Sequence, residues 1–155
     1  VYRGPNVFAG YYRRPDLAQN SFTADGFFRT GDFFIVRDER HIGFFDRKKD
    51  IIIRGGFNIS AAEVENLVLT HPGVQEVAAV AVPDEIMGEK TCIYVVPKDK
   101  ARLPTLEDIV DHLKQIGVAV YKLPEHIEYL DIIPRNPVGK ILKAQLRQRV
   151  HASGA

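Results

Sequence analysis

Residues 43–60 constrain this chain more than any other stretch, because their character changes three times in eighteen residues. An aromatic, turn-rich segment ends at Phe45, and residues 47–50 (Arg-Lys-Lys-Asp) form a charged run with nothing apolar to bury. Residues 51–53 are three isoleucines, which is typical of a buried strand. A charged joint between two differently built halves indicates a domain boundary, and the alternative on spacing alone is an ordinary surface turn.

The same stretch ends in a turn and the start of a helix. Gly55 and Gly56 can turn sharply or let the backbone approach a ligand, since neither has a Cβ. Ser60 followed by Glu63 is the signature of a capping box. We therefore expect a helix that begins at Ser60 with its apolar side chains on one face.

The two halves predict different structures. Residues 1–46 are rich in aromatic and turn residues and predict a β-hairpin over 33–45, with one helical turn at 15–20 and no self-sufficient core. Residues 50–150 predict a complete domain, and residues 151–155 a disordered tail. The expected strands of the 50–150 domain are 51–53, 74–82, 91–96 and 126–133. Its expected helices are 60–70, 105 to about 117, and 142–150. This βαββαβα order predicts an α+β fold, a small sheet with helices packed against it.

Composition narrows the class of protein. Apolar residues make up 45% and charged residues 26% of the chain, so a packed core is expected. A net charge of +1 gives no electrostatic reason for nucleic-acid binding. The single cysteine, Cys92, lies in a strand-like run and predicts a buried structural thiol in a reducing compartment. The chain begins without Met or a signal peptide, so we expect it to be part of something larger.

Several familiar sites are absent from the sequence. Gly139-Lys140 lacks the spacing of a nucleotide P-loop, and Gly55-Gly56 is not a dinucleotide fingerprint. The histidines show no metal-ligand spacing, and they are His41, His71, His112, His126 and His151.

Three polar features remain as candidates, each with a structural alternative. Asp32 follows Thr30-Gly31 and could accept two hydrogen bonds from a diol, or simply stabilise a turn. Lys140 follows a loop with two prolines that would hold its ammonium at a tip, or it is a solvated lysine before a helix. The Gly55-Gly56 pair could form the wall of a narrow channel, or merely a turn.

Taken together and in order, these features closely resemble the acyl-CoA synthetase branch of the adenylate-forming enzymes, the superfamily that also holds nonribosomal peptide adenylation domains and beetle luciferases. The resemblance covers essentially the whole chain. The residues that carry it are Tyr11-Tyr12-Arg13-Arg14-Pro15, Asp25-Gly26-Phe27-Phe28-Arg29-Thr30-Gly31-Asp32, the run from Asp46 to Ile59, and Asn136-Pro137-Val138-Gly139-Lys140.

This resemblance implies a two-step ligase that uses MgATP and CoA. A carboxylate attacks the α-phosphate of ATP to give an acyl-adenylate and pyrophosphate, and the thiol of CoA then displaces AMP. Between the steps the C-terminal domain swings about a hinge. The family would make residues 1–46 the tail of a larger N-terminal domain, 47–49 the hinge and 50–150 the mobile domain.

Site residues follow from the same resemblance. Asp32 would hold the ribose hydroxyls of ATP, Arg47 would help to bind the nucleotide, and Lys49 would be the hinge residue. Lys140 would be the adenylation lysine. The two glycines at 55 and 56 would line the tunnel for the pantetheine arm.

The sequence departs from the family pattern at two positions: Asp46 stands where glycine is usual, and Phe57 where glutamate is frequent. The family's phosphate loop, Mg²⁺ ligand and acid pocket belong to an N-terminal portion that is not present. We therefore expect the isolated chain to be inactive, with its own N-terminal domain as its partner.

The function that this resemblance implies is an AMP-forming acyl-CoA synthetase for a fatty or other small organic acid. The alternatives are an adenylation domain that loads a carrier protein, a non-catalytic α+β interaction module, and a luciferase-type oxidation. A cytoplasmic location is expected, with peripheral membrane association if the acid is fatty.

Overall fold

The computed structural model describes residues 1–152, with the side chains of the first 150, and divides the chain into two compact units, Val1–Lys49 and Asp50–Ala155. The first unit contains helix α1 (Pro15–Ser21) and an antiparallel hairpin of β1 (Asp32–Val36) and β2 (Ile42–Arg47). The ring of Phe8 packs edge to face against Tyr11, Phe22 and Phe28, and the last two also contact each other at a tilt. Within residues 1–49 no hydrophobic side chain is fully buried, as expected for a segment without its own core.

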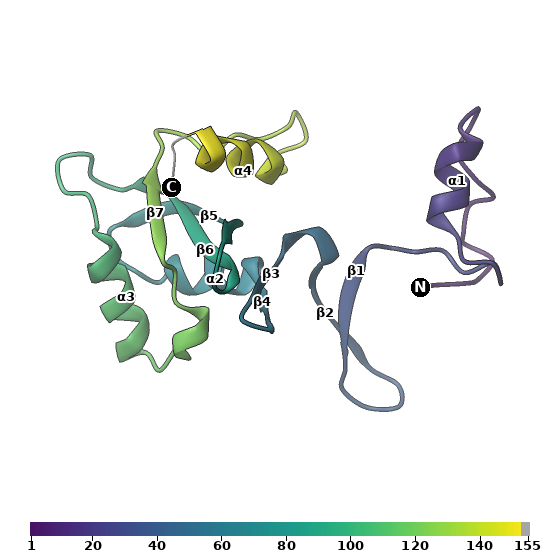
Figure 1. Ribbon diagram of the computed structural model, residues 1–155, viewed down its shortest axis with the longest axis horizontal. Helices are drawn as coiled ribbons and strands as arrows, with labels where there is room; N and C mark the ends of the chain where they lie inside the picture. The colour runs from purple at the N-terminus through teal and green to yellow at the C-terminus, as the bar shows by residue number, and fades with distance from the viewer. Residues whose placement is uncertain (153–155) are drawn as a thin grey trace. The chain divides into compact units, whose positions relative to one another are not determined.

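The second unit is a five-stranded sheet covered by helices on both faces (Figure 1). The strand order is β4-β3-β6-β5, and β7 pairs with β6 in parallel while the other pairs are antiparallel. The strands are β3 (Ile51–Arg54), β4 (Phe57–Ser60), β5 (Val74–Asp84), β6 (Gly88–Pro97) and β7 (His126–Tyr129). The helices are α2 (Ala61–Val68), α3 (Leu106–Gln115) and α4 (Lys143–Ala152), with short 3-10 turns at Lys48–Asp50 and Val120–Lys122.

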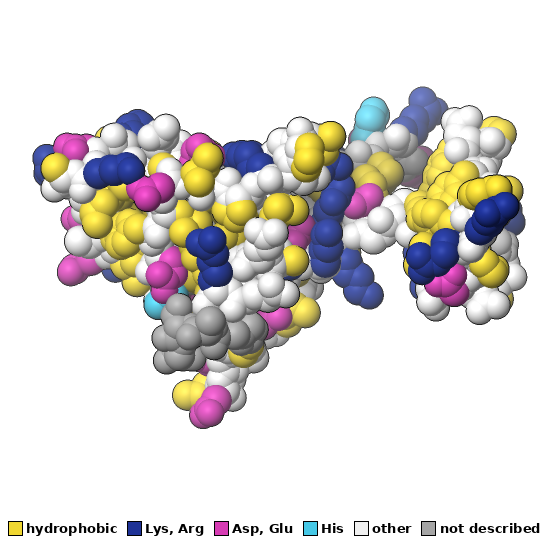
Figure 2. Space-filling view, turned by 90° about the horizontal axis from the view of Figure 1, so that it is seen from above, with side chains coloured by type: hydrophobic (Ala, Val, Ile, Leu, Met, Phe, Trp, Pro, Cys, Tyr) yellow, Lys and Arg dark blue, Asp and Glu magenta, His cyan; other side chains and the backbone are white. Residues whose placement is uncertain are grey.

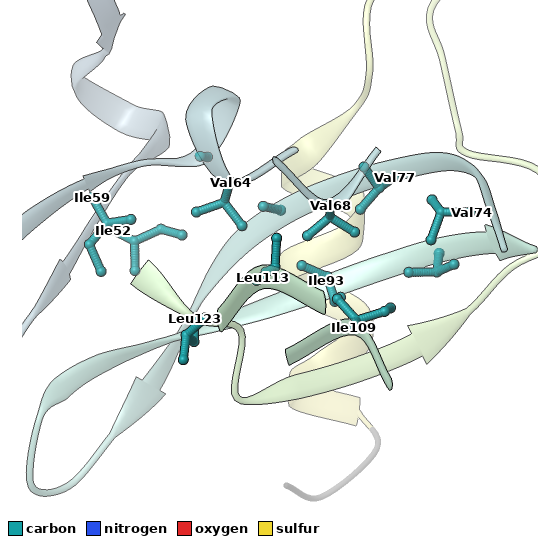
Figure 3. Close-up of a cluster of buried hydrophobic side chains, with 13 residues drawn as sticks. Ile52, Ile59, Val64, Val68, Val74, Val77, Ile93, Ile109, Leu113 and Leu123 are labelled. Carbon is teal, nitrogen blue, oxygen red and sulfur yellow. The ribbon is translucent and has the colours of Figure 1, made fainter. Parts of the chain in front are cut away.

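Alternate residues of β5 and β6 point to opposite faces of the sheet and pack into two separate hydrophobic cores. Val77, Ala79, Ile93 and Val95 face helices α2 and α3, where they join the cluster drawn in Figure 3. The intervening residues face α4, which contributes Leu146 and Val150 to a second cluster. A sheet that is buried on both faces requires strands that are apolar at nearly every position, which is what β5 and β6 provide.

Local signals set where the helices begin. The Ser60 hydroxyl accepts the Glu63 N–H at 3.1 Å, and Thr105 forms a reciprocal capping box with Asp108 at the start of α3. The prediction of an α+β fold with helices against a small sheet is confirmed.

Three expectations of secondary structure need correction. Phe57–Ser60 is a strand, β4, so the second unit begins with a hairpin rather than with a single strand. The strand expected over 126–133 ends at Tyr129, since only four residues pair with β6. The last helix continues through His151 and Ala152, which do not break a helix, so the predicted disordered tail does not begin at 151. Residues 153–155 of that predicted tail lie outside the described residues.

Cys92 is fully buried in β6, and burial raises the pKa of its thiol to about 12. A thiol with such a pKa stays protonated at neutral pH, so the expectation of a buried structural cysteine is confirmed. On the face in Figure 2, acidic and basic side chains are interspersed over the second unit. Among the described helices, none has the length and apolar character needed to cross a membrane.

Candidate functional site

The first unit holds a pocket of about 700 Å³ at the base of its hairpin. Asp32 begins β1 and Arg47 ends β2, so the hairpin register places them directly opposite each other. Their charged groups are 4.0 Å apart (Asp32 Oδ1 to Arg47 Nε), and neither side chain is buried. The pocket is lined by Thr30, Gly31, Asp32, Arg47, Lys48 and Lys49. Three cationic side chains against one carboxylate give the pocket a net positive charge, which suits a phosphate.

Hydrogen bonds from two backbone N–H groups fix the end of the hairpin where the pocket lies. The Lys48 N–H donates to the Gly31 carbonyl at 2.7 Å, and the Asp32 N–H donates to the Thr30 hydroxyl at 3.1 Å. Within residues 1–152 the Asp32 carboxylate accepts no hydrogen bond, so both oxygens can receive donors from a ligand. That arrangement fits a diol better than it fits the alternative of a turn-stabilising aspartate.

Asp46, which stands where the family usually has glycine, is almost completely buried. Its carboxylate accepts the Arg47 N–H at 2.7 Å. The strand pairing shifts register between Phe33 and Phe34, so Asp46 lies opposite Phe33 while Phe44 lies opposite Phe34. The departure therefore adds a contact to the backbone of Arg47 and keeps Arg47 opposite Asp32.

Lys140 ends a tight loop that its neighbours hold in one conformation. The Asn136 carboxamide oxygen accepts the N–H groups of Val138 and Lys140 at 3.2 and 2.8 Å. The Asn136 N–H in turn donates to the Lys140 carbonyl at 2.9 Å, and the loop closes as a bridge between Arg135 and Ile141. In the part of the chain that the structure describes, no carboxylate lies within 4.0 Å of the Lys140 ammonium. The cation is therefore exposed on a firmly held backbone and available to an anion.

Sequence reasoning assigned no role to the residues that hold this loop. Arg135 donates to the Gly139 carbonyl at 3.0 Å and also pairs with Glu76 of β5 at 2.7 Å. The role of Asn136 could have been inferred, since Asn before Pro-Val-Gly is a common turn initiator. The Arg135–Glu76 pair could not, because no local pattern connects the two residues.

Gly55 and Gly56 form the two-residue turn between β3 and β4, with φ of 54° and 85°. Positive φ at both central residues is typical of a type I′ hairpin, which is why two glycines stand here. A Cβ on Gly55 would come within 2.7 Å of the flexible Met87 Cε, whereas a Cβ on Gly56 would meet open space. The expected turn is present, and its outer side is uncovered within the described residues.

Phe57, the second departure from the family pattern, follows this turn. Its ring stacks on Tyr121 with centroids 4.5 Å apart and planes 16° apart. The ring is half exposed, so Phe57 adds an apolar surface beside the glycine turn.

Replacing Gly56 with alanine should destabilise the second unit by about 1–2 kcal/mol, because an L-residue is strained at this positive φ. Urea unfolding of the 155-residue chain measures the change. Asparagine tolerates the left-handed region better, so Gly56→Asn is the matched comparison and should lose less. Equal stability of Gly56→Ala and the unmodified chain would contradict the turn described here.

The structure thus brings Asp32 and Arg47 together in one unit and Gly55 and Gly56 together in the other, with Lys140 on a separate loop of the second unit. Lys49 is the last residue of the first unit and lies in the 3-10 turn Lys48–Asp50. Among the described residues, no three His, Cys, Asp or Glu side chains are grouped so that they could hold a metal ion.

Part of the chain matches a known protein family. Residues 63–140, half of the chain, match the family model described as the AMP-binding enzyme C-terminal domain. The chain belongs to the adenylate-forming enzymes. The match begins in α2 and ends at Lys140, so it covers strands β5, β6 and β7, helix α3 and the candidate lysine of this adenylate-forming C-terminal domain.

Individual relatives cover almost the whole chain. It is 39% identical to the 2,3-dihydroxybenzoate-AMP ligase of Bacillus subtilis, over 96% of this chain and 27% of the relative. It is 42% identical to the medium-chain fatty-acid–CoA ligase of Escherichia coli, over 96% of this chain and 26% of the relative. The structure of ATP-bound MatB from Rhodopseudomonas palustris matches with a TM-score of 0.82 and 35% identity, over 95% of this chain and 29% of that one. The chain thus spans about a quarter of the length of these relatives.

Proposed function

We propose that residues 1–155 are the C-terminal portion of an AMP-forming acyl-CoA synthetase. In this proposal residues 1–46 belong to the end of a larger N-terminal domain, 47–49 form a hinge, and 50–150 form a mobile domain. The observation that carries it is the Lys140 loop, whose backbone is held by Asn136 and whose ammonium has no carboxylate within 4.0 Å in the described chain. A positioned, uncompensated cation is what stabilisation of a pentavalent phosphate requires.

In the first step a carboxylate oxygen of the acid attacks the α-phosphorus of ATP, and the bond from that phosphorus to the pyrophosphate oxygen breaks. Lys140 donates hydrogen bonds to the oxygens that gather negative charge. Asp32 accepts hydrogen bonds from the ribose hydroxyls, and Arg47 adds positive charge near the phosphates. ATP enters with Mg²⁺, whose ligands we place in the N-terminal portion.

In the second step the thiol of CoA loses its proton and its sulfur attacks the acyl carbon, so that a thioester forms and AMP leaves. Gly55 and Gly56 would line the path of the pantetheine arm, because a wall without side chains suits a long, thin ligand. Lys49 would allow the change of orientation between the steps, since a charged residue at a domain joint has little packing to lose when the backbone rotates. The need for ATP and CoA and the single cysteine favour a cytoplasmic location.

The similarity to a fatty-acid–CoA ligase favours CoA as the acceptor, whereas the open glycine turn suits the pantetheine arm of either CoA or a carrier protein. A second candidate function, in which the acyl group is transferred to a carrier protein, fits the similarity to a 2,3-dihydroxybenzoate-AMP ligase, whose name includes AMP but not CoA. Both candidates share the adenylation step and differ only in the molecule that presents the thiol.

A release assay on the full-length enzyme tests the proposal. The enzyme is incubated with MgATP and a panel of acids that includes a medium-chain fatty acid and 2,3-dihydroxybenzoate, with and without CoA, and AMP and thioester are measured. The proposal predicts acid-dependent AMP release that requires CoA and yields acyl-CoA. Adenylate formation without transfer to CoA would instead support carrier loading, and no acid-dependent turnover of ATP would contradict a ligase. The isolated 155-residue chain should show no pyrophosphate exchange.

A further inference from the structure

A bidentate ion pair between Arg54 and Glu125 lies next to the Gly55-Gly56 turn. Arg54 is the last residue of β3, directly before Gly55, and its guanidinium faces the carboxylate of Glu125. The distances are 2.8 Å from Nε to Oε2 and 2.9 Å from Nη2 to Oε1. Two parallel charge-assisted hydrogen bonds fix the orientation of both groups as well as their separation.

Both members of the pair are largely shielded from water, with side chains 21% and 25% exposed. The hydrogen bond to Glu125 raises the pKa of Arg54, so the guanidinium remains charged. Glu125 is itself fixed, because its N–H donates to the Thr91 carbonyl of β6 at 2.9 Å and it directly precedes β7. The pair therefore ties the turn to the centre of the sheet.

Backbone pairing between β3 and the neighbouring strand β6 is short, although Ile52, Ile59 and the Phe57–Tyr121 stack hold the rest of the hairpin. The β3–β6 register consists of Arg54 opposite Gly88, in contrast to the long pairing between β5 and β6. The Gly55 N–H donates to the Met87 carbonyl at 2.8 Å, and the Ile53 N–H donates to the Glu89 carboxylate at 2.6 Å. With so short a register, removing the Arg54–Glu125 pair should let the Gly55-Gly56 end of the hairpin shift against β6, while Ile52 and Ile59 stay anchored in the core.

We infer that Arg54 and Glu125 are positioning residues for the thioester-forming step. The inference rests on the proposed function, which assigns the Gly55-Gly56 turn to the path of the thiol. Neither side chain needs to touch CoA. They set where the glycine backbone lies, and a displacement of about 1 Å in a positioning group can cost roughly 100-fold in rate.

The test measures the two half-reactions separately in the full-length enzyme. Adenylation is followed by acid-dependent pyrophosphate exchange, and thioester formation by adding CoA to pre-formed acyl-adenylate. In Arg54→Gln and Glu125→Gln the thioester step should fall roughly 10- to 100-fold while pyrophosphate exchange stays near the unmodified rate. Exchange also reports folding, because it requires Lys140 on the same unit.

Two further variants separate positioning from a general loss of structure. The reversed pair Arg54→Glu with Glu125→Arg restores the attraction and should recover part of the thioester step. The matched control is Lys143→Gln, which breaks the Lys143–Glu65 pair of the same unit, 2.7 Å long and similarly shielded at 13% and 16% exposure. It should not slow the thioester step selectively.

Equal losses in both half-reactions, no loss in either, or no recovery in the reversed pair would overturn the positioning role and leave the proposed function standing. Absence of both half-reactions in the unmodified enzyme would refute the proposed function and the inference together.

Discussion

Replacing Lys140 with alanine in the full-length enzyme is expected to lower acid-dependent ATP–pyrophosphate exchange by roughly 100- to 1,000-fold. The reason is electrostatic: the loop presents an ammonium that no described carboxylate neutralises, on a backbone that Asn136 fixes. Removing one pre-organised donor to a developing oxyanion costs about 3–4 kcal/mol in the barrier. The thioester step from pre-formed acyl-adenylate should be largely retained, since Lys140 is proposed to act on the phosphate only in the first step.

Lys100→Ala is the matched control for this prediction. Lys100 is also an exposed lysine in a loop of the second unit, where it pairs with Asp131. Its removal should leave both half-reactions unchanged. If Lys140→Ala lost both half-reactions equally, a structural role for the lysine would follow, and no loss in either would remove Lys140 from the site.

Replacing Leu113 with alanine should destabilise the second unit by about 2–5 kcal/mol. Leu113 is fully buried on α3 and projects into the cluster between that helix, α2 and the sheet (Figure 3). Truncation leaves a cavity whose walls can collapse only in part. Urea unfolding of the 155-residue chain gives the change in the free energy of unfolding.

Ile116 supplies the comparison, because it lies at the end of the same helix and is 49% exposed. Ile116→Ala should cost about 0.5 kcal/mol or less, as expected for a surface position. Similar losses for the two variants would mean that α3 does not pack on the sheet as described.

The helices and the long strands could be predicted from the sequence because their signals are local. Thr105 with Asp108 marks the start of α3, and the apolar spacing of Ile109 and Leu113 marks its buried face. Strand β4 was missed because only its last two residues are buried, although two glycines between apolar runs are a hairpin signal. The end of β7 was misplaced because apolar residues recur as far as Ile133, which is buried against α4 instead of pairing in the sheet.

The site was predictable to a different degree at each residue. The Lys140 loop follows from two prolines and a glycine, which restrict the backbone locally. That Asp32 and Arg47 face each other depends on a hairpin whose register shifts at Phe33 and Phe34, and a shift of this kind has no signature in residue type. Arg54 and Glu125 are 71 positions apart, so only the folded sheet brings them together.

The most direct test asks whether residues 50–150 act in both adenylation and thioester formation. Both half-reactions are assayed in parallel in the Lys140→Ala and Gly56→Leu variants of the same full-length enzyme. The leucine side chain would occupy the open space beside the turn, where the pantetheine arm is proposed to pass. We predict complementary losses: Lys140→Ala loses adenylation and keeps thioester formation, and Gly56→Leu does the reverse. If both variants lost the same half-reaction, the assignment of the loop and the turn to different steps would be contradicted.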